Sequence, residues 1–262
     1  MSFFKVLSSE WIKTKRTSIR IIVFTIPIVY PVFMLWYFSS YNHDSLWQIN
    51  IYNGYFEVLS IFLPFLISLI TGLFSFQEER AGGFYNLLVS SVSRKKLYLG
   101  KLSLTTFFII VDLVISTILI LLGMKYILHV EKIQYELFMQ GVLLTLIGSL
   151  ILITLHLFTS FAIGMGTSIA IGGIGFLISA IIGATVLGDK IWPFVPWAWP
   201  VRLSQLPMLK MPEIRDNFGL QMSELYIQEL IKGLLPAIVI FLIVTIISVF
   251  WFNRWEGKQS YE

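Results

Sequence analysis

The sequence contains no cysteine and few charged residues, and each absence removes a class of function. With no Cys among 262 residues, disulfides and thiolate metal sites are excluded. Only 13% of the residues are charged, against about 25% in a typical soluble domain. A chain that is 56% hydrophobic, with a mean hydropathy of +0.81, has too much apolar surface for one soluble fold. The composition therefore predicts an integral membrane protein.

Motifs for chemistry are also missing. No GxxxxGK[ST] sequence occurs, so nucleotide binding by a P-loop is excluded. Five glycines superficially resemble a nucleotide loop, but they lie in an apolar segment with no strand before it. Close helix packing explains them better. These glycines are Gly164, Gly166, Gly172, Gly173 and Gly175.

Neither a metal site nor an enzyme is expected. A zinc protease would need two histidines beside Glu78 and Glu79, but the topology derived below separates His43 and His129 from those glutamates. No Ser, His and Asp residues are arranged as a catalytic triad. The net charge of +4 comes from short basic clusters beside apolar segments. Such clusters indicate membrane topology, and we expect no nucleic-acid partner.

Six apolar segments are long enough to cross a bilayer, which takes about 20 helical residues. Lipid offers the backbone no hydrogen-bond partner, so each segment is expected to be a helix. We therefore predict an all-α integral membrane protein, with residues 1–262 forming one transmembrane domain. The predicted spans are Ile21–Phe38, Val58–Phe76, Leu102–Met124, Leu137–Phe158, Ile169–Leu187 and Leu234–Phe252.

The distribution of Lys and Arg predicts the orientation of these spans. If both termini are cytoplasmic, 12 of the 19 basic residues lie on the inner side. The first outer loop, Ser39–Glu57, then has none, and the second, Lys125–Glu136, has two. Such an excess of Lys and Arg in the cytoplasmic loops is typical of membrane proteins. The positions of the tryptophans support this orientation, because none of them lies in the middle of a predicted span.

The first 20 residues are predicted to form an amphipathic helix, Phe3–Arg20, lying in the inner interface of the membrane. Phe3, Leu7 and Trp11 recur every four residues, and the basic residues between them are placed to meet lipid phosphates. A solvated leader before the first span is the alternative.

The loop 77–101 is predicted to dock another protein on the cytoplasmic side. It breaks at Gly82-Gly83 and continues with an apolar stretch that has no reason to face water. An ordinary satisfied turn is the alternative. The residues proposed for docking are Glu78, Glu79, Phe84, Tyr85, Leu87, Leu88 and Arg94.

The outer segment 188–233 is rich in Trp, Pro and Met, and it is too apolar for a free loop. We predict short re-entrant helices that dip into the outer leaflet, followed by an amphipathic helix from about Ser223 to Lys232. Proline ends the short helices. Trp192, Trp197, Trp199 and Arg202 are the candidates for contact with a substrate.

Two polar residues lie inside predicted spans. Asp112 is a functional candidate because a carboxylate in a membrane is costly. The alternatives are that it stays protonated or bonds a neighbour such as Ser116. For His156, a hydrogen bond in helix packing is favoured over a role as a ligand.

Together these features resemble the type 2 ABC export permeases, and most closely the permeases of lantibiotic immunity transporters, the MutG type. The resemblance in architecture covers the whole chain. The most specific stretch is Gly188–Leu203 with its Trp and Pro cluster, supported by Ser9–Thr17, Leu99–Leu102 and His156–Gly166.

The resemblance implies a function without covalent chemistry in this chain. Two copies of an ABC ATPase bind ATP and Mg, so this chain binds no cofactor itself. The permease pairs with a second, different permease in the bacterial cytoplasmic membrane, and the complex removes a lantibiotic peptide from the membrane lipid. The loop from about Glu78 to Lys96 corresponds to the coupling helix that docks on the ATPase.

Two other functions remain open from the residues. One is a proton-coupled secondary carrier that uses Asp112. The other is a membrane protein that confers immunity by sequestering the peptide without transport. Copurification of an ATPase would separate both from an ABC permease.

Overall fold

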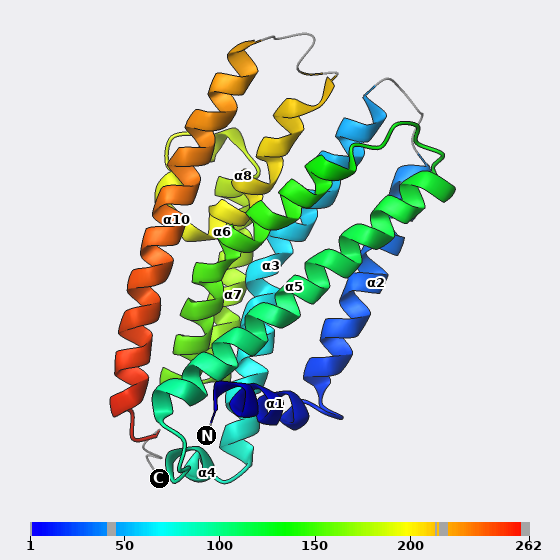
Figure 1. The fold of residues 1–262 in the computed structure, drawn as a ribbon. Coiled ribbons are helices and arrows are strands. Elements are labelled where there is room, and N and C mark those ends of the chain that lie inside the picture. The colour runs from blue at the N-terminus through cyan, green and yellow to red at the C-terminus, as the bar shows by residue number, and fades with distance from the viewer. Residues whose placement is uncertain (1, 41–45, 213, 215–219, 258–262) are drawn as a thin grey trace.

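The structure is a computed structural model that describes residues 2–40, 46–212, 214 and 220–257 (Figure 1). The described residues form helices and turns without a strand, so the all-α prediction is confirmed. Among these described residues, six helices are long and apolar enough to cross a membrane, which confirms the six spans. They are α2 (Ser18–Ser39), α3 (Trp47–Arg80), α5 (Arg94–Tyr126), α6 (Tyr135–Ala162), α7 (Met165–Ile178, extended by the π-turn η1, Ser179–Gly183) and α10 (Leu220–Arg254).

The remaining elements are short and lie in two groups. At one end are α1 (Phe3–Lys13) and α4 (Tyr85–Leu88), together with the C-terminal end of α10 (Figure 1). We call this the terminal end. Between α7 and α10 lie α8 (Trp199–Gln205) and the 3₁₀ turns η2 (Val186–Gly188), η3 (Trp192–Phe194), η4 (Pro196–Ala198) and η5 (Leu206–Lys210).

The N-terminal helix is shorter than the sequence predicts. It ends at Lys13 instead of Arg20, because the chain turns at Arg16, whose φ is 61°. Few residues other than glycine adopt this left-handed conformation, and it stops a helix. Arg20 belongs to α2, and its guanidinium donates to the Trp11 carbonyl oxygen at 2.8 Å. The turn allows α1 to lie across the end of the bundle (Figure 1).

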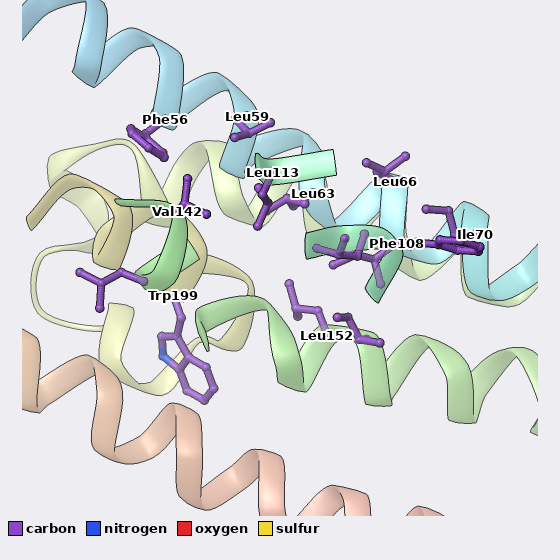
Figure 2. Close-up of a cluster of buried hydrophobic side chains, with 14 of the residues drawn as sticks. Phe56, Leu59, Leu63, Leu66, Ile70, Phe108, Leu113, Val142, Leu152 and Trp199 are labelled. Carbon is purple, nitrogen blue, oxygen red and sulfur yellow. The ribbon is translucent and has the colours of Figure 1, made fainter. Parts of the chain in front are cut away.

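The core of the bundle lies around α3 and α6. In each, 67% of the most apolar stretch is buried inside the protein, compared with 22% in α7 and 17% in α10. Side chains of α3, among them Phe56 and Leu63, meet Leu113 of α5 and Leu152 of α6 in this core (Figure 2). The outer faces of α7 and α10 are therefore left for lipid or for another protein.

The segment between α7 and α10 enters the bundle more deeply than expected. Trp199 is fully buried, and a Cβ at Gly148, half-way along α6, would lie 2.9 Å from Pro200 N and 3.0 Å from Trp199 C. The expectation that no tryptophan lies in mid-span is therefore wrong for Trp199. The missing side chain of Gly148 allows this close approach.

The second half of that segment also differs from the prediction. The helix expected from Ser223 to Lys232 is not a separate element, because α10 runs without interruption from Leu220 to Arg254. The Ser223 side chain lies outside the described residues. Ile227 and Ile231 are exposed, while Gly233 packs against Trp192 and Leu203. This part of α10 thus has apolar residues on its exposed side as well as on the side that packs against the protein. The helix can therefore extend beyond the predicted span.

Replacing Gly148 by Ala should destabilise the protein, because the new methyl group meets backbone atoms that cannot move aside. We expect a loss of roughly 1–3 kcal/mol, as in other overpacked sites. Gly173 is the matched control, since a Cβ there meets no atom within 4 Å. Gly173→Ala should have no cost or stabilise slightly. Thermal unfolding in one detergent checks both variants, and equal midpoints would contradict the packing.

Candidate functional site

A buried network of charged side chains joins three elements at the terminal end. Lys101, in the second turn of α5, places its Nζ 2.5 Å from Glu10 Oε2 and 2.6 Å from Glu78 Oε1. Lys13 Nζ closes the network, at 2.8 Å from Glu10 Oε1 and 2.8 Å from Glu78 Oε1. The network connects α1, the last turns of α3 and the start of α5.

Burial makes this network different from a surface salt bridge. The side chains of Lys101 and Glu10 are each 1% exposed, and that of Glu78 is 7% exposed. A buried charge is tolerated only with a close partner, and removing one partner is strongly destabilising. Lys13 is 41% exposed. Burial lowers the pKa of Lys13, but the carboxylates of Glu10 and Glu78 outweigh this and raise it above its usual value.

Tight packing holds α1 in place over this network. Val6 and Glu10, four residues apart, are the buried side chains of α1. A Cβ at Gly100 of α5 would lie 2.8 Å from Val6 Cγ1, so the glycine lets the two helices approach. Gln77 adds a hydrogen bond from its Nε2 to the Lys13 carbonyl oxygen, at 2.7 Å. α1 is thereby fixed to the end of α3 as well as to α5.

The loop after α3 is anchored to the same end by an aromatic side chain. Phe84 has a φ of 68°, which is uncommon for a bulky residue, and its side chain is buried. Its ring lies 5.0 Å from the Trp255 ring and 6.0 Å from the Phe161 ring, between centroids. Arg94 donates from its guanidinium to the Trp255 carbonyl oxygen. The loop is therefore connected to α6 and to the chain after α10.

The structure separates the residues proposed for docking into two groups. Phe84 and Leu87 are buried within the chain, and Leu88 packs partly against the core. Tyr85 is 65% exposed, and so is its neighbour Val89, at 62%, which the sequence did not single out. The exposed face of α4 is therefore the part that can contact another protein, while the buried face ties α4 to the bundle.

A cavity of about 380 Å³ lies beside α4, between α1 and the end of α3. It is lined by Glu10, Lys13 and Glu78 of the network and by Asn86 and Leu87 of the loop. A side chain inserted from outside would therefore reach the charge network directly.

Sequence reasoning did not assign Glu10 and Lys101 to the site. Two features could have identified them. Glu10 shares the buried face of α1 with Val6, and Lys101 lies among apolar residues at the start of a span. The positions are 91 residues apart, and nothing local pairs them. Glu78 was identified, although for docking and not for its buried ion pairs.

The candidate substrate residues lie between α7 and α10. Arg202 forms an ion pair with Asp189, at 2.8 Å between Nη1 and Oδ1, and donates to the Thr185 carbonyl oxygen at 2.6 Å. Arg202 and the buried Trp192 line a cavity of about 410 Å³, together with Glu229 of α10. Trp199 is fully buried, and its indole Nε1 donates to the Pro193 carbonyl oxygen at 3.1 Å. Trp197 is half-buried.

The two intramembrane polar residues lie apart from these sites. His156 is buried in α6, and its Nδ1 lies 3.4 Å from Ser168 Oγ of α7. Asp112 is buried in α5 and makes no hydrogen bond with Ser116, whose hydroxyl accepts one from Tyr55 instead. In the part of the chain that the structure describes, no three His, Asp or Glu side chains gather as metal ligands.

The comparison with known families decides the class of the protein. A family model described as "ABC-2 family transporter protein" matches residues 6–188, which is more than half of the chain. The chain belongs to the ABC-2 transporter family. The match runs from α1 to the end of η2, so it includes the charge network and the loop 77–101. A search of curated proteins and a search of solved structures found no match.

Family membership gives this ABC-2 permease a coarse function. It is a membrane-spanning subunit of an ABC transporter, and its partner is an ABC ATPase. ABC-2 permeases are the transport component and not the catalytic one. The Trp and Pro cluster at 192–203 lies beyond the matched residues, so the family match does not cover it.

Lys101→Met should destabilise the permease by about 3–5 kcal/mol, because it leaves Glu10 and Glu78 buried without their main partner. Lys13→Met is the control. Its side chain is 41% exposed, so we expect about 1 kcal/mol or less. Thermal unfolding in detergent measures both.

A rescue variant separates charge from packing. Lys101→Met combined with Glu10→Gln and Glu78→Gln removes both carboxylates and should regain most of the lost stability, because no buried charge remains unpaired. If the triple variant unfolds as early as Lys101→Met, the network does not stabilise this end through its charges.

Proposed function

We propose that this ABC-2 permease exports an amphipathic antimicrobial peptide of the lantibiotic type from the bacterial cytoplasmic membrane and thereby protects the cell. The observation that carries the coupling part of this proposal is the buried network of Lys101 with Glu10 and Glu78. It joins the two helices that flank α4 to each other and to α1. A displacement of α4 would therefore reach two transmembrane helices at once.

In this proposal the terminal end faces the cytoplasm, and both termini are cytoplasmic. The support is the concentration of Lys and Arg at this end, as the positive-inside rule requires. α1 then lies at the inner interface, where its exposed Phe4 and Ile12 are suited to contact lipid.

The ABC ATPase is proposed to dock on the exposed face of α4. Tyr85 and Val89 offer an aromatic and an aliphatic contact. The cavity of about 380 Å³, which Asn86 and Leu87 of the same loop line, has room for an inserted side chain. Binding of ATP would bring two ATPase copies together and move α4, and with it α3 and α5. Such motions of rigid elements are a common switching mechanism.

The same proposal includes a second, different permease and lipid around the spans. Ile174 and Leu177 of α7 and Ile243 of α10 are each at least 50% exposed. Apolar exposure of this kind suits lipid or another transmembrane helix.

The peptide cargo rests on the resemblance of the outer segment 188–203 to lantibiotic immunity permeases. The cavity of about 410 Å³ adds support, because Trp192 and Leu206 lie there beside two ion pairs, Asp189 with Arg202 and Glu229 with Lys232. Such a lining combines charged groups with apolar surface, which suits an amphipathic peptide.

Placing charge on the exposed face of α4 should uncouple the transporter. We expect Tyr85→Asp with Val89→Asp to abolish peptide-stimulated ATP hydrolysis in the purified complex, because burying a new carboxylate at the interface is costly. Val186→Asp is the control, since Val186 is 81% exposed and lies in η2, between α7 and α10.

Survival of a sensitive strain exposed to a lantibiotic provides the functional readout. Cells producing the native chain with its ATPase should survive higher peptide concentrations, and the α4 variant should remove that protection. Protection that persists after ATP depletion would instead support sequestration without transport. If the peptide still stimulates ATP hydrolysis in the α4 variant, the ATPase docks on another part of the permease.

A further inference from the structure

A buried carboxyl group without a hydrogen-bond partner lies in the middle of the membrane-spanning region. Asp112 is 2% exposed, and neither of its carboxylate oxygens has a partner among the described residues. A charge at such a position is costly and is normally paired. By contrast, Lys101 of the same helix α5 is paired with both Glu10 and Glu78 in the charge network at the terminal end.

The polar neighbours of Asp112 are already engaged with one another. The Tyr55 hydroxyl lies 2.9 Å from Ser116 Oγ and 3.0 Å from Thr117 Oγ1. The Tyr30 hydroxyl donates to the Tyr55 carbonyl oxygen at 2.5 Å. These groups hold α2, α3 and α5 together, and none of them satisfies the carboxyl group of Asp112.

Asp112 lines a cleft of about 340 Å³ whose other walls are almost entirely apolar. The walls come from α2 and α3, and the rim faces away from the core, because Val29, Phe33 and Phe62 are each more than 50% exposed. The other wall residues include Ile26, Val58 and Leu66. The cleft is therefore accessible sideways, from the region that lipid chains occupy.

The shape and charge of this cleft define one kind of occupant. At about 340 Å³, the cleft has a volume in the range of small-molecule binding sites. Its apolar walls fit a hydrocarbon chain. Asp112 is among the residues that line the cleft, and its carboxyl group lacks a hydrogen-bond donor. An ammonium group supplies both donors and the opposite charge.

We propose that this cleft is a binding site for an alkyl chain that carries a primary ammonium group. The chain lies between α2 and α3, and the ammonium group pairs with Asp112. The site stands independently of the proposed peptide cargo, because it follows from the cleft and the unpartnered carboxyl group alone. It is also separate from the cavity between α7 and α10.

Photolabelling of the complex with its ATPase, in nanodiscs of zwitterionic lipid, tests this site. The probes are dodecylamine and dodecanol, each with the same photoreactive group on the chain, and labelled peptides are identified by mass spectrometry. We expect the amine to label α2 and α3 at the cleft. In Asp112→Asn that labelling should fall about tenfold or more, because a hydrogen-bonded charge pair is lost. The uncharged alcohol should label both forms equally and weakly.

A second variant keeps the test independent of Asp112. Val29→Phe places a larger side chain at the rim and should reduce labelling by the amine, with Asp112 intact. Val239→Phe on α10 is the matched control, since Val239 is also exposed and lies outside the cleft walls. Elution of each variant as an intact complex in size-exclusion chromatography verifies that it folds.

Three results would overturn the proposal. Equal labelling by the amine and the alcohol in the native protein would mean that the cleft holds any lipid chain. Unchanged amine labelling in Asp112→Asn would mean that the carboxyl group is not the partner. Protection of the cleft by cross-linking to a second permease subunit would mean that another protein covers it. None of these results depends on transport of a peptide, so the site and the proposed function can fail separately.

Discussion

The pairing of Lys101 with Glu10 and Glu78 is the interaction on which the terminal end of this permease depends. A lysine with 1% of its side chain exposed is stable only because two carboxylates lie within 2.6 Å of its Nζ. The same three residues come from α5, α1 and α3. The position of the short helix α4 follows from this pairing, since α4 connects the charged end of α3 to the start of α5.

The rest of the molecule is arranged around that fixed point. Phe84 and Arg94 attach the loop to Trp255, so the chain after α10 is joined to the same end. Away from this end, small residues replace charges as the means of close packing, and Gly148 admits the backbone of α8 into the middle of the bundle. One end is therefore held by buried charges and aromatic contacts, while the segment between α7 and α10 is held by close packing together with the ion pair of Arg202 with Asp189. In the proposed mechanism the terminal end transmits the motion of the ATPase.

The sequence predicts those features that depend on local composition. The six spans were found because an apolar stretch of about 20 residues is a local property. The N-terminal helix and the loop after α3 were also placed, although Arg16 ends the first helix earlier than expected. Features that depend on distant partners were missed: Glu10 and Lys101 are 91 residues apart. The depth of Trp199 was missed for the same reason, because it is set by a glycine on another helix. The burial of Leu87 and the exposure of Tyr85 likewise follow from packing that the sequence of α4 alone does not contain.

The central claim is that the exposed face of α4 contacts an ABC ATPase. Site-specific photocross-linking tests it most directly, with a photoreactive phenylalanine analogue replacing Tyr85 in one preparation and Phe194 in another. Both side chains are well exposed, at 65% and 83%, but Phe194 lies in η3, in the segment between α7 and α10. The account predicts a covalent product between this chain and the ATPase from position 85 and none from position 194. Cross-linking from position 194 but not from position 85 would contradict both the docking surface and the proposed orientation.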